Sequence, residues 1–428
     1  MSEWKEVKLG DYIDMTNGYA FKSKSFVNRG IPVLKIKNIK TNKIIIEDID
    51  YISADDNNPR YTIIKPNDLI ITMTGNRIDG APETWVGKVA LFNLDGKYFL
   101  NQRLSIIRVK KDLVNLLFIL YSLTTIDAQK YFITHATSSG GQANISPDIV
   151  KNFTIKLPSY IIQSEIAGIL SSLDAKIETN NKLNEKLEEM AQAIFKSWFV
   201  DFEPFKDKPF HETELGMIPE GWEVSTFSSI IEKLISGDWG KETPTGNYVH
   251  KVACIRGCDF ENIKNGLRGK TPERFILERN FALKQPKPND IVVEMSGGTA
   301  TVSTGRICYI TKELLDQYEG DIVCTNFCKI VRPLKGWSQY LYYYWQYKYD
   351  KKVMFCYENG TSGIKNFAIN DFIDIESLLI PPKDELIKFN SIIDNIRVKI
   401  QMNGVENTRL ASLRDTLLPR LMSGELIV

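Results

Sequence analysis

Long apolar runs are missing from this sequence: no stretch approaches the roughly 18–20 consecutive apolar residues that a transmembrane helix needs. The opening segment, MSEWKEVKLGDY, is polar from the start and lacks the apolar core of a secretory signal. Cysteine is scarce, with six residues in 428, far below the density of a disulfide-stapled scaffold. These absences predict a cytoplasmic protein that works in a reducing compartment and away from membranes.

An excess of charge of one sign is also missing, because 54 Lys and Arg face 53 Asp and Glu, for a net charge of +1. Duplex DNA favours basic proteins, since each neutralised phosphate releases counterions. Composition alone therefore does not indicate a nucleic-acid partner. A DNA-binding protein of this composition must gather its Lys and Arg on one face or take positive charge from partner subunits.

Signatures of catalytic chemistry are lacking as well. The sequence has no Walker A loop, no GxGxxG opening a βα unit, no Asn-Pro-Pro-aromatic motif of the amino-methyltransferases and no nuclease-like set of carboxylates. Cys254-x3-Cys258 and Cys324-x3-Cys328 differ from the CxxC spacing of zinc sites and lie in apolar, strand-like segments. We therefore expect these cysteines to be core thiols, and we expect no metal, no cofactor and no catalytic residue in this chain.

What the sequence does contain is an internal repeat of about 220 residues. The matched segments keep their order, and their offset stays between 218 and 224 residues. Such a repeat is too long for a solenoid and indicates two copies of one module related by a pseudo-two-fold axis. The module is either a duplicated enzyme or ligand-binding domain, or a device that reads two separated sites on a long partner. The pairs are WKEVKLGDYI (4–13) with WEVSTFSSII (222–231), IKPNDLIITMTG (64–75) with PKPNDIVVEMSG (286–297), GKVALF (87–92) with GRICYI (305–310), NQRLSIIRV (101–109) with TNFCKIVRP (325–333), TSSGGQANIS (137–146) with TSGIKNFAIN (361–370), and IAGILSSLDAKIETN (166–180) with FNSIIDNIRVKIQMN (389–403).

The first part of each module, about 150 residues, is rich in short β-type runs separated by turn-forming residues, as in IPVLKIKNI (31–39) and LSIIRV (104–109). A helical stretch follows at 114–131, and its counterpart at 337–350, WSQYLYYYWQYKYD, is dense in aromatic residues. Aromatic side chains stack on unpaired bases in some proteins, but helical spacing favours packing in a core. We predict mixed α/β domains with mainly antiparallel strands.

The second part of each module is a long helix with an apolar seam whose steps alternate between four and three residues, the pattern of a coiled coil. About 40 residues of helix span roughly 60 Å at 1.5 Å per residue, which is typical of a spacer or an oligomerisation rod. The seams are Ile166, Leu170, Leu173, Ile177, Asn180, Asn184, Leu187, Ala191, Ile194 and Trp198, and Phe389, Ile393, Ile396, Ile400, Asn403, Asn407, Leu410, Arg414, Leu417 and Leu421.

Both seams carry an asparagine pair at the same two steps. A seam asparagine lowers stability but selects register, because its amide needs a partner. If the helices pack antiparallel about the pseudo-two-fold axis, Asn180 faces Asn407 and Asn184 faces Asn403. The alternative is that these four positions face solvent and the seam drifts around the helix.

Several segments resemble those of the specificity subunits of type I restriction–modification enzymes. The resemblance extends over nearly the whole chain, although the second copy lacks SGGQANIS in full and ends its helix with LLPRLM. The segments are WKEVKLGDY (4–12), KPNDLIITMTG (65–75), LNQRLSIIRV (100–109), SGGQANIS (139–146), AIFKSWFVDFEP (193–204) and PEGWEV (219–224).

The resemblance implies an α+β fold with two pseudo-symmetric mixed α/β target-recognition domains separated by two long antiparallel coiled-coil helices. The expected boundaries are 1–157 for the first recognition domain, 158–203 for the first spacer helix, 204–218 for a linker, 219–380 for the second recognition domain and 381–428 for the second spacer helix.

The resemblance also implies the partners. Each recognition domain reads one half of a bipartite target in double-stranded DNA, and the helices dock two methyltransferase (modification) subunits, which translocating restriction nuclease subunits join. S-adenosylmethionine, ATP and Mg are expected on those partner subunits and not on this chain.

Base readout is expected from Arg, Lys, Asn, Gln, Ser and Thr in loops, with phosphate contacts beside it. Two glycine-containing loops in each copy are the candidates, because glycine lets the backbone approach a groove closely. In copy one the loops at 72–88 and 138–144 supply Thr74, Asn76, Arg77, Lys88, Ser139, Gln142 and Asn144. Further phosphate candidates in copy one are Lys22, Lys24, Lys35 and Lys37. In copy two the equivalent loop residues are Ser296, Thr299, Thr301, Ser303, Arg306, Thr361, Ser362, Lys365 and Asn366, and possible phosphate or guanine ligands are Arg256 and Arg268.

Two other functions remain open at this point: a self-contained duplicated DNA methyltransferase with an unrecognised cofactor site, and a coiled-coil scaffold that does not bind DNA. Titration of S-adenosylmethionine against the isolated chain distinguishes the first alternative, and fluorescence anisotropy with random duplex distinguishes the second.

Overall fold

The computed structural model describes residues 4–56, 58–77, 82–110, 113–139, 141–299, 301–360 and 364–428. The chain divides into two compact units: the first comprises Met1–Ala175 with Ala411–Val428, and the second comprises Lys176–Leu410. Each unit therefore contains the first part of one copy of the repeat and portions of both long helices.

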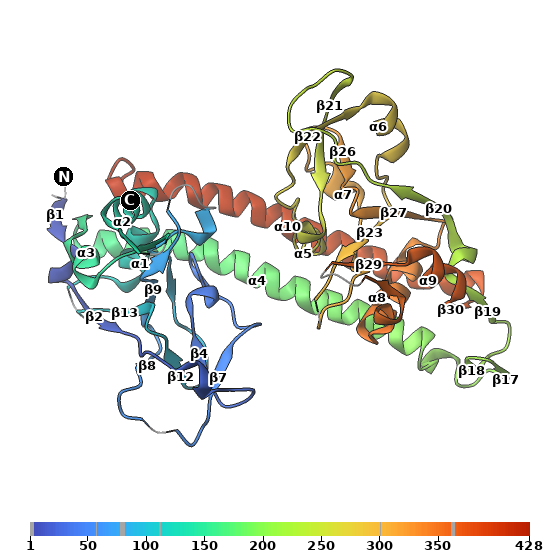
Figure 1. The fold of residues 1–428 in the computed structure, drawn as a ribbon, viewed down its shortest axis with the longest axis horizontal. Coiled ribbons are helices and arrows are strands. Elements are labelled where there is room, and N and C mark those ends of the chain that lie inside the picture. Colours follow the sequence, from blue (N-terminus) through green and yellow to red (C-terminus); the bar gives the residue numbers. More distant parts are fainter. Residues whose placement is uncertain are drawn as a thin grey trace. The chain divides into compact units, whose positions relative to one another are not determined.

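The first unit contains three short helices and many short strands, as the β-type runs predict (Figure 1). The helices are α1 (Leu116–Thr124), α2 (Ile126–His135) and α3 (Pro147–Asn152). The strands are β1 (Lys5–Lys8), β2 (Ile13–Asn17), β3 (Phe26–Val27), β4 (Ile31–Leu34), β5 (Ile39–Lys40), β6 (Lys43–Ile44), β7 (Asp50–Ile52), β8 (Ile63–Ile64), β9 (Leu69–Thr72), β10 (Thr74–Gly75), β11 (Val89–Leu91), β12 (Tyr98–Leu100), β13 (Leu104–Val109), β14 (Thr137–Ser139), β15 (Gln142–Asn144) and β16 (Thr154–Leu157).

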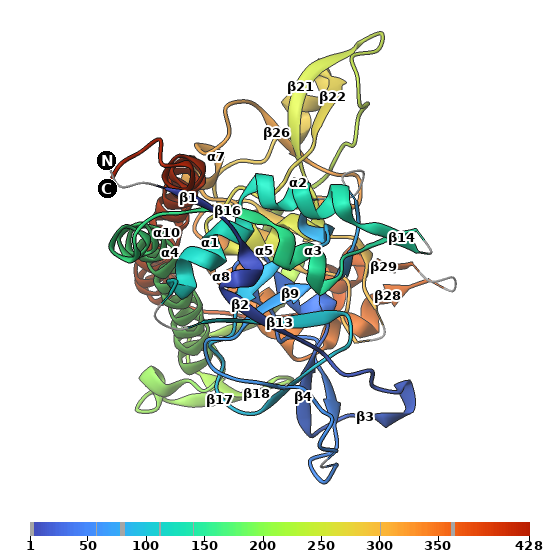
Figure 2. The same cartoon turned by 90° about the vertical axis from the view of Figure 1, so that its left-hand side faces the viewer.

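The centre of the first unit is an antiparallel sheet of order β11-β9-β13-β2. Side chains alternate between its faces, so Leu69 and Ile71 belong to a core shared with α1 and α2, whereas Ile70 belongs to a second core with Leu34 and Phe92. Figure 2 shows α1 and α2 with this sheet. The other described sheets have the orders β3-β7-β4-β12-β8, β10-β15-β14, β5-β6 and β1-β16.

The second unit repeats this plan. Its short helices are α5 (Phe260–Lys264), α6 (Glu278–Lys284), α7 (Lys312–Leu315), α8 (Ser338–Asp350) and α9 (Ile369–Ile375). Its strands are β17 (Phe210–Thr213), β18 (Gly216–Pro219), β19 (Glu223–Thr226), β20 (Ile231–Ser236), β21 (Tyr248–Ile255), β22 (Glu273–Leu277), β23 (Ile291–Glu294), β24 (Ser296–Gly297), β25 (Ile307–Tyr309), β26 (Ile322–Cys324), β27 (Cys328–Pro333), β28 (Glu358–Asn359), β29 (Lys365–Phe367) and β30 (Ser377–Ile380).

The matched segments of the repeat occupy matched strands. The sheet β20-β27-β23-β25 corresponds, strand for strand, to β2-β13-β9-β11, and β24-β29-β28 corresponds to β10-β15-β14. The two copies predicted from the sequence therefore fold with the same strand topology. The segment expected to be a linker also contains structure, since β17 and β18 pair there as an antiparallel hairpin.

The repeated Pro-Asn-Asp segments form the same tight turn in both units. The asparagine has a positive φ in each, +68° at Asn67 and +75° at Asn289. The Asp68 carboxylate accepts two hydrogen bonds from Arg108 at 2.6 and 2.8 Å, and a third from the Lys65 backbone N–H at 2.8 Å. The Asp290 carboxylate accepts the equivalent bonds from Arg332 and the Lys287 backbone N–H. The segment recurs because its aspartate connects the turn, through an arginine, to the adjacent strand.

The aromatic helix α8 is a core element, as its spacing predicts. Tyr340, Tyr342, Tyr343 and Trp345 are each at most 1% exposed. Half-buried Arg397 lies over the rings of Tyr309 and Tyr342, with its guanidinium carbon 4.2 Å from each centroid. These aromatic rings therefore make their contacts in the interior of the second unit.

The two long helices are α4 (Tyr160–Phe199) and α10 (Lys383–Ser423). All twenty seam residues are buried or half-buried, which confirms the predicted seams. None of the helices in the described part of the chain combines the length and the apolar character that crossing a membrane requires.

Hydrogen bonds within the second unit confirm the predicted register of α4 and α10. Asn180 Nδ2 donates to Asn407 Oδ1 at 2.9 Å, and Asn403 Nδ2 donates to Asn184 Oδ1 at 2.8 Å. All four side chains are at most 4% exposed, so the alternative that they face solvent is wrong. Because the partner number falls as the residue number rises, the helices are antiparallel there.

Candidate functional site

In the first unit, the small sheet β10-β15-β14 brings together the two loops that the sequence selects. Thr74 pairs with Asn144 across β10 and β15, and Gly75 pairs with Ala143. The Thr74 hydroxyl donates to Asn144 Oδ1 at 2.8 Å. Thr74 is only 6% exposed, so its hydroxyl joins the two strands.

The exposed candidates of this sheet also have local partners. Asn76 Nδ2 donates to Thr84 Oγ1 at 2.9 Å, and Arg77 donates to the Ala136 carbonyl at 3.1 Å. Gln142 Oε1 accepts from Arg103 at 2.9 Å. Such hydrogen bonds hold exposed donors and acceptors in place near the ends of the loops. Ser139 closes β14.

Lys88, a candidate of the loop 72–88, and Ser146, which follows the loop 138–144, have structural positions. Lys88 is 7% exposed, and burial lowers the pKa of its ammonium group. Ser146, the last residue of SGGQANIS, caps α3: its hydroxyl accepts from the Ile149 backbone N–H at 3.3 Å, and Pro147 occupies the first helical turn.

The four lysines from the start of the chain fall into two groups. Lys22 and Lys24 are exposed. Lys35 and Lys37 form ion pairs with Asp50 at 3.0 and 3.2 Å. Burial alone would raise the pKa of the Asp50 carboxyl, but the hydrogen bonds from both lysines outweigh it and lower the pKa.

In the second unit, β24-β29-β28 reproduces the small sheet. Ser296 pairs with Asn366 across β24 and β29, and its hydroxyl donates to Asn366 Oδ1 at 2.5 Å. This is the same hydroxyl–amide pair as Thr74 with Asn144, at the same place in the topology. The two loop systems are therefore two copies of one site.

The loop after β24 carries the remaining hydroxyl candidates. Thr299 and Thr301 are exposed, with their hydroxyl oxygens 3.3 Å apart. Ser303 is only 3% exposed. Thr361 and Ser362 lie outside the described residues.

Carboxylates already hold three of the cations expected in the second unit. Arg306 forms a two-pronged pair with Glu294 at 2.6 and 2.8 Å. Lys365 Nζ lies 2.6 Å from Glu358 Oε2, and Arg256 pairs with Asp259.

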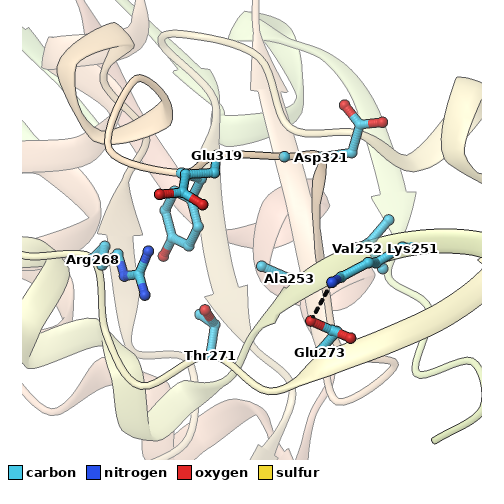
Figure 3. A pocket seen from close by; sticks show the side chains of 10 residues that line it. Lys251, Val252, Ala253, Arg268, Thr271, Glu273, Glu319 and Asp321 are labelled. Atoms are coloured by element: carbon cyan, nitrogen blue, oxygen red, sulfur yellow. Dashed lines mark ion pairs between the residues drawn. The ribbon is translucent and has the colours of Figure 1, made fainter. Parts of the chain in front are cut away.

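Arg268 is exposed and lines a hollow of about 530 Å³ (Figure 3). Its guanidinium carbon lies 5.9 Å from the ring centroid of Tyr318. The hollow also contains Glu319, Asp321 and a Lys251–Glu273 ion pair of 2.7 Å. The mixture of charges gives no concentrated positive field for phosphates.

The expectation for the paired cysteines is met at three of the four positions. Cys254, Cys324 and Cys328 are buried, and burial raises the pKa of Cys254 and Cys328 to about 12. Cys258 is exposed, so its assignment to the core is wrong. It lies in the short 3-10 turn Gly257–Asp259, which follows β21, and not in the interior of a strand. Within the described residues, no group of three or more His, Cys, Asp and Glu has the geometry to hold a metal ion.

Sequence reasoning missed a pair of tight turns beside the small sheets, at residues 101–104 and 325–328. The repeat contained the signal, because NQRLSIIRV and TNFCKIVRP are matched segments. Only the structure shows that their second and third residues are exposed.

The duplicated modules and the paired long helices define a fold class that comparison with known proteins identifies. Residues 1–189 match the family model described as "Type I restriction modification DNA specificity domain". The crystal structure of the type I restriction-modification system S subunit from M. genitalium superposes with a TM-score of 0.54 at 16% identity, covering 98% of this chain and 96% of that one, which shows a shared fold.

Two relatives agree with this result. The chain is 25% identical to the type I restriction enzyme HindI specificity subunit of Haemophilus influenzae, with 100% of both chains covered. It is 29% identical to the type I restriction enzyme MjaIX specificity subunit of Methanocaldococcus jannaschii over 68% of this chain and 65% of that subunit's length. The family model and both relatives thus show that the chain is similar to type I restriction enzyme specificity subunits.

Proposed function

We propose that this chain is the sequence-specific DNA-binding specificity subunit of a type I restriction–modification complex and reads a bipartite target with one recognition domain per half. The observation that carries the proposal is the duplicated small sheet, with Thr74–Asn144 in one unit and Ser296–Asn366 in the other. Two copies of one site on a single chain suit two half-sequences on one duplex.

The exposed side chains of these sheets supply the expected chemistry. Asn76, Arg77 and Gln142 carry amide and guanidinium groups that match base edges in the major groove. Lys22 and Lys24, which are exposed, suit phosphate oxygens. The ion-paired cations position their loops instead of supplying free charge, so partner subunits supply much of the positive field.

The chain is a non-catalytic part of the complex in this proposal. Two methyltransferase subunits dock on the long helices, translocating nuclease subunits join them, and S-adenosylmethionine, ATP and Mg bind to those partners in the cytoplasm. The buried thiols support this view, because their raised pKa values keep them protonated and unreactive.

A domain exchange tests the proposal. Residues 1–157 are replaced by those of a relative with a different target, the hybrid is expressed with its methyltransferase subunits, and genomic methylation is sequenced. One half of the methylated sequence changes and the other half stays. A change in both halves, or in neither, contradicts the assignment of one domain to one half.

Titration of S-adenosylmethionine into the isolated chain tests the absence of catalysis. A duplicated methyltransferase binds the cofactor tightly, whereas a specificity subunit does not.

A further inference from the structure

A tight turn precedes the same strand in both units. The Leu104 N–H donates to the Asn101 carbonyl at 2.9 Å just before β13, and the Cys328 N–H donates to the Thr325 carbonyl at 2.9 Å just before β27. Each turn therefore has a hydrogen bond between its first and fourth residues.

The backbone around the two turns is the same. The Arg103 carbonyl accepts from the Met73 N–H at 2.9 Å, and the Phe327 carbonyl accepts from the Met295 N–H at 2.8 Å. These bonds connect each turn to Met73 or Met295, the residue that lies between the central sheet and the small sheet.

A glycine lies against each turn. A Cβ at Gly18 would come within 2.1 Å of the Asn101 carbonyl oxygen, and a Cβ at Gly237 within 2.0 Å of the Thr325 carbonyl oxygen. No other residue type fits at this distance from a backbone. The framework therefore holds both turns rigidly in equivalent positions.

The side chains that this framework displays differ between the units. Gln102 and Arg103 are exposed in the first turn, and Asn326 and Phe327 in the second. Phe327 is 59% exposed although it is a large apolar residue. Its backbone N–H donates to the Thr325 hydroxyl at 3.0 Å, so the exposed ring is carried by a backbone segment that is held in place.

The first turn also touches the candidate site directly. The Arg103 guanidinium donates to Gln142 Oε1 at 2.9 Å, which joins the turn to β15 of the small sheet. In the second unit, Phe327 lies beside β24, because its carbonyl accepts from the Met295 N–H and Met295 directly precedes Ser296 of that strand. Each turn thus extends the surface of its small sheet.

We propose that these two turns are base-reading elements and that Arg103 and Phe327 determine specificity in the first and second half-site. This inference rests on the proposed function. A guanidinium presents paired donors that match O6 and N7 of guanine, and an apolar ring matches the thymine methyl group. The amides of Gln102 and Asn326 match the adenine edge in the same groove.

A contact with phosphate does not account for the pattern. Phosphates are the same in both half-sites, so a phosphate contact at the third position of the turn would need a donor there in both units, and Phe327, which aligns with Arg103, has none on its side chain. A constant framework with changed side chains is what reading two different half-sequences requires.

The test uses the full chain assembled with its methyltransferase subunits and a duplex library randomised in both half-sites. Arg103→Ala lowers the preference at one base pair of one half-site by about 5- to 150-fold. Phe327→Ala relaxes a position in the other half-site only, and Phe327→Arg creates a preference for guanine there. Lys130→Ala is the matched control, because Lys130 is an exposed cation on α2 and is not part of the turn.

The outcomes separate the inference from the proposed function. If the wild-type complex selects no bipartite sequence, both fail. If the wild type selects one and the folded turn variants select the same sequence, the inference alone fails. Equal weakening of random and specific duplex by Arg103→Ala, with the salt slope reduced by roughly one, identifies a phosphate contact and also overturns the inference.

Discussion

At the scale of single residues, Glu358 connects three parts of the second unit. Its carboxylate accepts from the Thr304 backbone N–H at 2.7 Å, from the Thr304 hydroxyl at 3.1 Å and from Lys365 Nζ at 2.6 Å. Burial alone would raise the pKa of this carboxyl, but the hydrogen bonds from Lys365 and Thr304 outweigh it and lower the pKa. The charged form of Glu358 therefore stabilises the folded protein.

Glu358→Gln should remove this stabilisation. Because the pKa is lowered in the folded state, the contribution is present above the ordinary pKa of 4.5 and is lost as the pH falls through the folded value. We expect the substitution to lower the free energy of unfolding at pH 7 by about 1–2 kcal/mol. We expect a smaller effect at pH 3.

Urea unfolding at both pH values measures the difference. Glu212→Gln, a change at an exposed glutamate of β17, is the control. An equal loss at both pH values would show that the charge of Glu358 contributes nothing.

The sequence identified the candidate loops but not the state of their side chains. The partners of Lys37, Arg306 and Arg332 lie between 11 and 42 residues away, at Asp48, Glu294 and Asp290. No periodic pattern reports such pairs, because they depend on strand register and loop path. The sequence therefore shows which loops contain lysine or arginine, but it does not show whether those side chains are free to bind a ligand.

At the scale of elements, Gly404 in the interior of α10 has a packing role that the sequence did not reveal. A Cβ at Gly404 would lie 2.3 Å from the Gly266 carbonyl oxygen. Gly266 has a φ of +76°, and its carbonyl accepts from Gln317 Nε2 at 2.9 Å. Beside it, Asn184 Nδ2 donates to the Asn265 carbonyl at 3.2 Å. The loop after α5 thus packs backbone to backbone against α10.

Two glycine substitutions should therefore have opposite signs. Glycine inside a helix is less stable than alanine by about 0.5–1 kcal/mol, so Gly168→Ala, in open space on α4, should raise the free energy of unfolding by that amount. Gly404→Ala should lower it by about 1–3 kcal/mol, because the new methyl group collides with backbone. Chemical denaturation of the two variants checks this. A stabilising Gly404→Ala would show that the loop moves away at no cost.

The asparagine layer can be tested by a double-mutant cycle. Asn403→Leu leaves Asn184 Oδ1 buried without this donor and should lower the free energy of unfolding by about 1–3 kcal/mol. The combination with Asn184→Leu should be less harmful than the sum of the single changes, with a coupling of about 1–2 kcal/mol. Asn395→Leu, at an exposed position of α10, serves as the control. Additive effects would mean that the two amides do not depend on each other.

The elements themselves were predictable to different degrees. The seams of α4 and α10 were predictable, because a period near 3.5 persists over ten positions in each helix. The contact at Gly404 was not, because the aligned position in the first copy is Asn181, whose side chain instead accepts from Asn407 at 2.9 Å. A contact that only one of the two copies makes cannot be recognised from the repeated sequence.

At the scale of the whole molecule, both long helices belong to both units, since the division falls at residues 175 and 176 in α4 and at 410 and 411 in α10. The Asp174–Arg414 ion pair of 2.7 Å places those two positions opposite each other within the first unit. The helices are therefore continuous elements in which residues can be added without altering either recognition domain.

Inserting one heptad after Ala175 and one after Ser412 should lengthen the DNA spacer between the half-sites by about three base pairs, since seven residues add about 10 Å against 3.4 Å per pair. The half-sequences themselves should not change. Methylation sequencing of a host with the altered subunit and its partners measures both. Insertion into α4 alone leaves the asparagine pairs of the second unit facing each other, but it shifts Asp174 and the seam residues before it relative to Arg414 and should destabilise the chain. An unchanged spacer with both insertions would contradict a spacing role for the helices.

The core of the first unit also depends on the far end of the chain. Leu421 is fully buried in it, and Leu417, Leu418 and Met422 pack against it. The second unit, by contrast, lies wholly between residues 176 and 410. During translation the second unit is therefore complete before the first, although the first is begun earlier. A ribosome that stops early releases a chain whose first domain still exposes the apolar surface that α10 covers, a feature by which chaperones and proteases recognise unfinished protein. A chain in which only the second unit is finished would thus be removed by the same machinery.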